Sequence, residues 1–142
     1  YAMEFNSTDT AATISTITGL TEGRSYMYAQ ENGNDADGSA LESHVTSGDF
    51  VIPQAGERLM SIKRFIPDFK NQKGTVNVNL NFKLYPTSNT ATNGPYAVTT
   101  STTKVDTRAR GRQASIKIST SAIDTTWRYG TYRAEIQPDG MR

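Results

Sequence analysis

The sequence predicts an all-β fold, an antiparallel sandwich-like or barrel-like domain with long loops. Residues 75–84 alternate strictly between apolar and polar side chains, and no apolar pattern of helical period appears past residue 50. Short segments rich in β-branched residues are separated there by turns containing Gly, Pro or Asn. Alternation with period two places every second side chain on one face of a strand. Several short strands without helices indicate a sandwich or a barrel.

The individual strands follow from the same pattern. The clearest strand is expected over 75–84, and 59–69 is expected as a second strand that a polar turn over 70–74 joins to it as a hairpin. Further strands are expected over 12–20, 41–51, 96–105, 112–119 and 126–136, and the polar stretch after Pro86, with Asn93-Gly94-Pro95, is expected as a long loop. The expected core residues are Val76, Val78, Leu80, Phe82, Leu84, Ile116, Ile118 and Ile136.

Composition excludes several classes of function. The chain has 142 residues, no cysteine and a single histidine, His44. It therefore has no disulfide framework, no thiolate zinc site, no cysteine nucleophile and no two-histidine metal site. No stretch approaches the roughly 18 consecutive apolar residues of a membrane span. We expect no enzymatic activity, no cofactor, no metal and no membrane span.

Two local patterns suggest catalytic or metal chemistry only weakly. Asp35, Asp37 and Gly38 have the spacing of part of a calcium loop, but the remaining ligand positions of that loop fall on unsuitable residues. Ser43, His44 and Asp49 are close in sequence, yet no serine has the flanking glycines of a nucleophile elbow. An exposed loop over 31–39 and a solvated histidine are the simpler interpretations.

Charge divides the chain into two parts. Residues 1–43 hold seven acidic residues and one basic residue, whereas the rest of the chain is basic. We therefore expect an acidic, Thr-rich segment over 1–40 and a β domain over 41–142. Because the numbering begins at Tyr1, the sequence is expected to be part of a larger chain, and residues 2–5 resemble a cloning scar.

Basic residues cluster in the second part of the chain. Strict alternation would place Arg108, Arg110 and Arg112 on the apolar face of the next strand, and burying three unpaired guanidinium groups is untenable. Either Gly111 hosts a bulge, or the strand begins only at about residue 112. In both cases we expect structural or inter-subunit ion pairs with carboxylates, and phosphate contact is the alternative. The candidate residues are Asp106, Arg108, Arg110, Arg112, Arg128, Arg133 and Asp139.

An ordered series of short motifs resembles a known family. The motifs are Lys104-Val-Asp-Thr-Arg-Ala-Arg-Gly-Arg-Gln113, Ile116-Lys-Ile118, Trp127-Arg-Tyr-Gly-Thr-Tyr-Arg133 and Pro138-Asp-Gly-Met-Arg142, preceded by Ser47-Gly48-Asp49-Phe50 and Arg64-Phe-Ile-Pro-Asp-Phe69. Over about 41–142 they resemble the C-terminal region of tailed-bacteriophage structural proteins. The resemblance is closest to tail nozzle proteins (tail tubular B, or packaged-DNA stabilisation) of short-tailed phages. Met141 stands where the family usually has a second basic residue.

The resemblance implies a virion structural subunit in the phage tail. Such a subunit belongs to a sixfold ring of copies of itself that contacts neighbouring tail proteins, lets DNA exit and helps retain the packaged genome. It implies non-specific DNA contact at most, and no enzyme. The alternative class is a carbohydrate- or receptor-binding β-sandwich of an adhesin or tail fibre. In that class Tyr26, Tyr28, Tyr96 and Trp127 would be exposed and stack on sugars.

Overall fold

The computed structural model describes residues 2–5, 25–28, 33–36, 38–52 and 58–141, and they form strands, turns and bends without a helix. The chain divides into two compact units, Tyr1–Gly33 and Asn34–Arg142. In the first unit, β1 (Ala2–Phe5) pairs antiparallel with β2 (Ser25–Tyr28). The expected all-β, antiparallel, sandwich-like fold is confirmed for the described residues.

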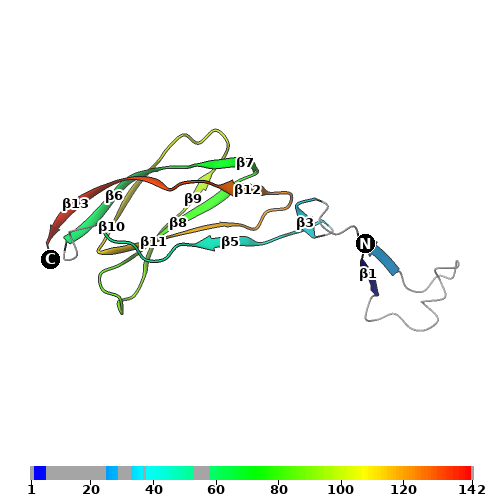
Figure 1. Ribbon diagram of the computed structural model, residues 1–142, viewed down its shortest axis with the longest axis horizontal. Helices are drawn as coiled ribbons and strands as arrows, with labels where there is room; N and C mark the ends of the chain where they lie inside the picture. The colour runs from blue at the N-terminus through cyan, green and yellow to red at the C-terminus, as the bar shows by residue number, and fades with distance from the viewer. Residues whose placement is uncertain (1, 6–24, 29–32, 37, 53–57, 142) are drawn as a thin grey trace. The chain divides into compact units, whose positions relative to one another are not determined.

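The second unit contains two main antiparallel sheets and two small ones (Figure 1). The three-stranded sheet has the order β10 (Val105–Gly111), β6 (Arg58–Ile66), β13 (Arg133–Met141). The four-stranded sheet has the order β5 (Ser43–Thr46), β11 (Gln113–Thr120), β8 (Val76–Lys83), β9 (Ala91–Val98). The small sheets pair β12 (Thr126–Tyr129) with β7 (Phe69–Lys73), and β3 (Asp35–Ala36) with β4 (Ser39–Ala40).

The two main sheets both contribute to one hydrophobic core. β8 has the alternation that the sequence predicts, with Val76, Val78, Leu80 and Phe82 buried and the intervening polar residues partly exposed. The other buried members of the core are Met60, Ile62, Phe65, Val98, Ala109, Ala114, Ile116 and Ile118. Full burial of such side chains stabilises the fold by about 1.5–3 kcal/mol each before the entropy cost.

Strand β6 contains a bulge that lets one strand bury apolar residues out of strict alternation. Ile62 pairs with Ile136 and Arg64 with Glu135, which leaves Lys63 without a partner in β13. The extra residue, Lys63, shifts which side chains point to each face of the sheet. Ile62 and Phe65 are therefore both buried, while Arg64 is exposed.

The chain changes sheet at a corner between β10 and β11. Gly111 ends β10 in the three-stranded sheet, and Gln113 begins β11 in the four-stranded sheet. Arg112 lies between them, and its backbone N–H donates to the Lys83 carbonyl oxygen over 2.9 Å. The corner therefore resets the alternation, which leaves Arg108 and Arg110 exposed although both would share the apolar face of one unbroken strand.

Asp68 forms the joint between two successive strand pairs. β6 pairs with β13, and beyond Pro67-Asp68 the chain continues as β7, which pairs with β12. The Asp68 carbonyl oxygen accepts from the Gly130 N–H at 2.8 Å, and its carboxylate accepts from the Thr131 N–H at 3.0 Å. These bonds hold residues 130–131 against Asp68 at the point where strand pairing is interrupted between the two strand pairs.

Several sequence-based boundaries are wrong, because pairing between distant strands decides them. The expected hairpin of 59–69 and 75–84 does not form, since β6 and β8 belong to different sheets and the expected turn contains β7. The expected strand over 96–105 is divided by a turn, and the expected strand over 126–136 is interrupted at 130–132. Asn93-Gly94-Pro95 lies within β9.

The core prediction is wrong at Leu84, which is 53% exposed because β8 ends before it. Ile136, another predicted core residue, is only partly buried against the core.

The part of the expected 31–39 loop that the structure describes forms the β3–β4 hairpin, and β5 provides the strand expected within 41–51. The expected strand over 12–20 lies outside the described residues, and the division at residue 40 stays a prediction.

Candidate interaction surface

The outer face of the three-stranded sheet carries most of the predicted charged residues. In β10, Thr107, Ala109 and Gly111 are buried, and Arg108 and Arg110 alternate with them on the exposed side. In β13, the exposed residues include Arg133 and Glu135. This charged face, consisting of Asp106, Arg108, Arg110, Arg64, Arg133, Glu135 and Asp139, is the candidate interaction surface.

Arg64 lies at the centre of the charged face. The strand register aligns it with Asp106 of β10 on one side and Glu135 of β13 on the other. Its Nε atom lies 3.5 Å from an Asp106 carboxylate oxygen and 3.2 Å from one of Glu135. All three side chains are 44–64% exposed, so each pair contributes at most about 1 kcal/mol to stability.

Arg110 reaches across the central strand to the far strand of the same sheet. It is aligned with Ser61 of β6, which is aligned in turn with Gln137 of β13. The Arg110 Nε atom lies 2.8 Å from an Asp139 carboxylate oxygen, and its Nη2 donates to the Asp139 carbonyl oxygen at 3.0 Å. The two contacts restrain the guanidinium in a way that a lysine ammonium does not reproduce.

The other predicted arginines are distributed differently. Arg112 belongs to the sheet corner, where its guanidinium lies 4.9 Å from the centre of the Tyr85 ring. Arg128 is exposed on β12, aligned with Lys70 of β7, and so lies in a different sheet. Among the described residues, no ion pair involves Arg108, Arg128 or Arg133.

The structure therefore brings together Arg110 and Asp139, but it joins Asp106 to Arg64 instead of to a member of the arginine series. Sequence reasoning missed Arg64 as a member of this surface. Its position within an expected strand was visible, but the alignment of three strands that are distant in sequence was not.

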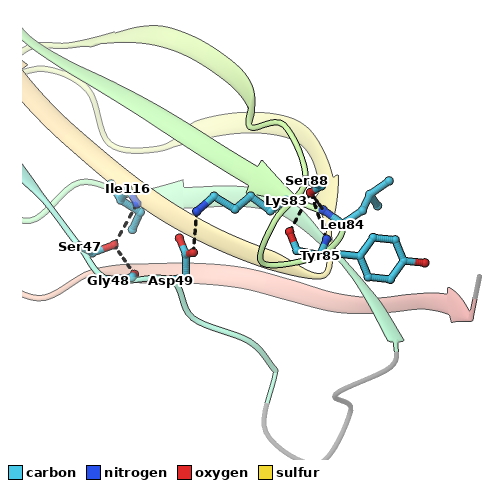
Figure 2. Close-up of polar contacts among 8 residues, drawn as sticks. All are labelled: Ser47, Gly48, Asp49, Lys83, Leu84, Tyr85, Ser88 and Ile116. Carbon is cyan, nitrogen blue, oxygen red and sulfur yellow. Dashed lines mark hydrogen bonds and ion pairs between the residues drawn. The ribbon is translucent and has the colours of Figure 1, made fainter.

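The Ser47-Gly48-Asp49 segment is fastened to the four-stranded sheet by its side chains (Figure 2). The Ile116 N–H donates to the Ser47 hydroxyl oxygen at 3.0 Å, and the Ser47 N–H donates to the Ile116 carbonyl oxygen at 2.9 Å. Asp49 accepts from the Lys83 ammonium at 2.9 Å, across β11. At 28% and 35% exposure, this ion pair is the least exposed among the described residues.

The turn after β8 presents two large side chains to solvent. The backbone N–H groups of Leu84 and Tyr85 both donate to the Ser88 hydroxyl oxygen at 3.1 Å, and that hydroxyl donates to the Tyr85 carbonyl oxygen at 2.8 Å. Leu84 and Tyr85 are 53% and 54% exposed, and both point outward in Figure 2.

A polar hollow of about 400 Å³ lies beside β7 and the turn that follows β9. Its lining contains no charged side chain and consists of Pro67, Phe69, Asn71, Gln72, Thr99, Thr100 and Thr102. Sequence reasoning gave no signal for it, because the two lining segments are separated by the whole of β8 and β9.

The catalytic and metal patterns considered from the sequence are engaged elsewhere or not assembled. The Ser43 hydroxyl oxygen accepts from the Trp127 indole N–H at 3.2 Å, and Asp49 pairs with Lys83. In the part of the chain that the structure describes, no group of three or more His, Cys, Asp or Glu side chains is placed to hold a metal ion. The described residues also contain no helix long and apolar enough to span a membrane.

Two of the four aromatic residues expected to be exposed for sugar stacking are packed instead. Tyr96 and Trp127 are partly buried against the core, and they make edge-to-face contacts with Phe65 and Phe69, respectively. These two rings pack against neighbouring side chains because β9 and β12 border the core. The side chains of Tyr26 and Tyr28 lie outside the described part of the structure.

No protein family matches the sequence, and no curated protein matches it.

Proposed function

We propose that this chain is a non-enzymatic structural subunit of a phage tail, of the nozzle type. In this role it forms a sixfold ring with copies of itself, contacts neighbouring tail proteins in the virion, and helps hold the packaged DNA that leaves through the ring. The ordered series of motifs over 41–142 is the basis of the proposal.

The observation that carries the proposal is that the motif segments lie next to one another in the fold. Segment 64–69 pairs with 129–133, through Ile66 with Arg133 and Phe69 with Tyr129. Segment 105–111 pairs with β6, and Phe50 pairs with Ala114. The short motifs therefore lie in one connected set of paired strands. This arrangement is expected of motifs that serve the fold and not a catalytic site.

The charged face gives this framework a means of assembly. Its ion pairs are half exposed and contribute little to the stability of a single copy. The same carboxylates and guanidinium groups are therefore free to form pairs across a subunit boundary at small cost. Arginine is enriched in protein interfaces and forms planar bidentate pairs with carboxylates.

The experiment uses the full polypeptide from which this sequence is expected to derive. Electron microscopy of the purified polypeptide should show rings of six subunits. Replacing Arg110 and Arg112 together by lysine keeps the charge but removes the planar contacts, so the double variant should form fewer rings or melt earlier. Lys104→Arg, at an exposed position outside the charged face, is the matched control and should assemble normally.

A polypeptide that stays monomeric at all concentrations, and is absent from phage particles by mass spectrometry, would contradict the proposal. A double lysine variant that assembles and melts like the wild type would leave the ring but refute the role of the arginine series. Loss of DNA retention on charge removal alone would then assign those arginines to phosphate contact.

A further inference from the structure

Strand β5 has a free edge in the four-stranded sheet (Figure 1). Within the described residues it pairs only with β11. The Ser47 N–H, directly after β5, donates to the Ile116 carbonyl oxygen of β11 at 2.9 Å. Alternate residues of an antiparallel strand turn their N–H and C=O groups to opposite sides, so Val45 also faces β11, whereas His44 and Thr46 face away from it. These two residues therefore present unpaired backbone donors and acceptors.

The other three outer strands of the main sheets each carry a feature that hinders pairing at an edge. β9 contains Pro95 and β13 contains Pro138, which have no N–H to donate, and the register of both strands shifts. β10 also has a register shift, and it carries Arg108 and Arg110. Proline, bulges and charges are the features that protect natural sheet edges. β5 has the sequence Ser-His-Val-Thr and pairs with β11 without a shift, so it has none of them.

Exposed apolar side chains accompany this free edge. Leu41, Val45 and Val51 are 52%, 44% and 46% exposed, and all three lie in or beside β5. Val45 is aligned with the buried Ile118, so it lies on the core side of the sheet, at its border. A strand added to β5 would therefore cover Val45 while it bonded to the free backbone groups.

We propose that β5 pairs antiparallel with β5 of a second copy of this chain, with Val45 on the two-fold axis. His44 and Thr46 flank Val45 symmetrically, so an axis there uses all their outward N–H and C=O groups, each bonding to the other residue of the second copy. The two valines then lie directly opposite each other, which is a favourable pair in a sheet. No Lys, Arg, Asp or Glu lies in β5 to oppose its own copy.

This pairing joins the two four-stranded sheets into one continuous sheet. It uses no residue of the charged face, which belongs to the three-stranded sheet. The proposal therefore does not depend on the proposed role in a phage tail.

The first test measures self-association of residues 1–142 by sedimentation. The sedimentation coefficient should rise from that of a monomer to that of a dimer, with a dissociation constant on the order of 0.1 mM, because the interface is small. Thr46→Pro removes an outward N–H and leaves the bonds to β11 in place. It should weaken the dimer by about tenfold or more, since two hydrogen bonds are lost. Thr90→Pro, at an exposed position outside the strands, is the control and should dimerise like the wild type.

The second test uses the absence of cysteine from the chain. Opposed residues of a non-hydrogen-bonded antiparallel pair have Cα atoms about 4.5 Å apart, which a disulfide can span. Val45→Cys should therefore form a disulfide-linked dimer under mild oxidation, seen on a non-reducing gel. Thr90→Cys, which is also exposed, is the matched control and should cross-link much more slowly.

Two results would overturn the proposal. One is a wild type that stays monomeric up to about 1 mM, ten times the expected dissociation constant. If Thr46→Pro then also melts earlier than Thr90→Pro, the edge of β5 is covered within one chain. The other is equal cross-linking of Val45→Cys and Thr90→Cys, which would show that β5 does not meet its own copy at Val45.

Discussion

At the level of single residues, Tyr132 combines favourable packing with an unfavourable hydroxyl. Its ring stacks on Phe65 with the centroids 6.3 Å apart and lies 6.2 Å from the Phe50 ring. Its hydroxyl oxygen is buried without a hydrogen-bond partner among the described residues. Burial, followed by the influence of Tyr129, raises the pKa of Tyr132 above its ordinary value. The ring therefore stabilises the core, and the hydroxyl does not.

Removing only this hydroxyl should not destabilise the protein. We expect Tyr132→Phe to leave the free energy of unfolding unchanged or to raise it by about 1 kcal/mol, because a buried unpaired polar group costs about 1–3 kcal/mol. Tyr132→Ala should instead lower it by about 3–5 kcal/mol, through loss of the ring. Urea denaturation measures both. A loss of 2 kcal/mol or so in the phenylalanine variant would indicate a hydrogen bond to the hydroxyl.

The raised pKa of Tyr132 adds a pH dependence with a definite sign. The unfolded chain loses the phenolic proton near the ordinary value of 10.0, whereas the folded protein keeps it to higher pH. The contribution to stability is therefore complete below that value and declines as the pH rises above it. Tyr132→Phe should lose less stability than the wild type over this alkaline range, as measured by urea denaturation at two pH values.

Gly111 is required at the sheet corner for steric reasons. A Cβ atom there would lie 3.0 Å from Cβ and Cδ1 of Phe82 and 3.2 Å from the Lys83 carbonyl oxygen, which accepts the Arg112 N–H. Gly111→Ala should therefore lower the free energy of unfolding by about 1–3 kcal/mol. Gly48→Ala is the matched control, since no atom lies within 4 Å of its added Cβ. Equal melting temperatures for the two variants would refute the steric argument.

At the level of elements, the attachment of the 47–50 segment to β11 and β8 can be dissected. Asp49 and Lys83 form an ion pair that is only about one-third exposed, so it should be worth more than the pairs of the charged face. A double-mutant cycle with Asp49→Asn and Lys83→Met should give a coupling free energy of about 1 kcal/mol. The same cycle with Arg110→Met and Asp139→Asn, at about half exposure, should give about half of that.

The order of these two coupling energies is the critical result of the comparison. If the Arg110–Asp139 coupling equals or exceeds the Asp49–Lys83 coupling, burial is not what decides their strength. High salt should weaken the more exposed pair more strongly, because solvent ions screen it better.

The elements also show which parts of the fold the sequence determines locally. The alternation of 76–83 and of 116–118 depends only on neighbouring residues, and both segments have the expected burial. The sheet in which each strand lies depends on partners distant in sequence. The expected hairpin of β6 with β8 therefore failed, as did the expected strand over 126–136, which Gly130 and Asp68 interrupt.

The candidate surface was predictable to a similar extent. Sequence reasoning recognised that Arg108 and Arg110 needed carboxylate or solvent, because three buried guanidinium groups are unacceptable. It did not identify Arg64 as the partner of Asp106, since that pair follows from the register of β6 with β10. The polar hollow is formed by β7 and by the turn after β9, which are distant in sequence, and its residues carry no distinctive motif.

At the level of the whole molecule, the charge distribution limits what the chain can do with DNA. The formal net charge is only +1 at pH 7, because the acidic residues of the first 43 positions offset the basic remainder. On the charged face, Arg64 and Arg110 are already paired with carboxylates, while Arg108 and Arg133 are exposed without an ion pair among the described residues. On this face, few cations are therefore available for phosphate.

We therefore expect weak DNA binding that does not depend on sequence and that falls as salt rises. About two phosphate contacts, from Arg108 and Arg133, predict a slope of roughly −2 for log affinity against log salt, from the release of about one counterion per contact. Arg108→Gln should reduce the magnitude of that slope by about one, because it removes one contact. Lys83→Gln, which removes a cation already paired with Asp49, should leave the slope unchanged.

Fluorescence anisotropy with two duplexes of different sequence, at several salt concentrations, measures these slopes. Tight binding to one duplex at high salt would show that base contacts dominate, and an unchanged slope in Arg108→Gln would place the phosphate contacts elsewhere on the chain.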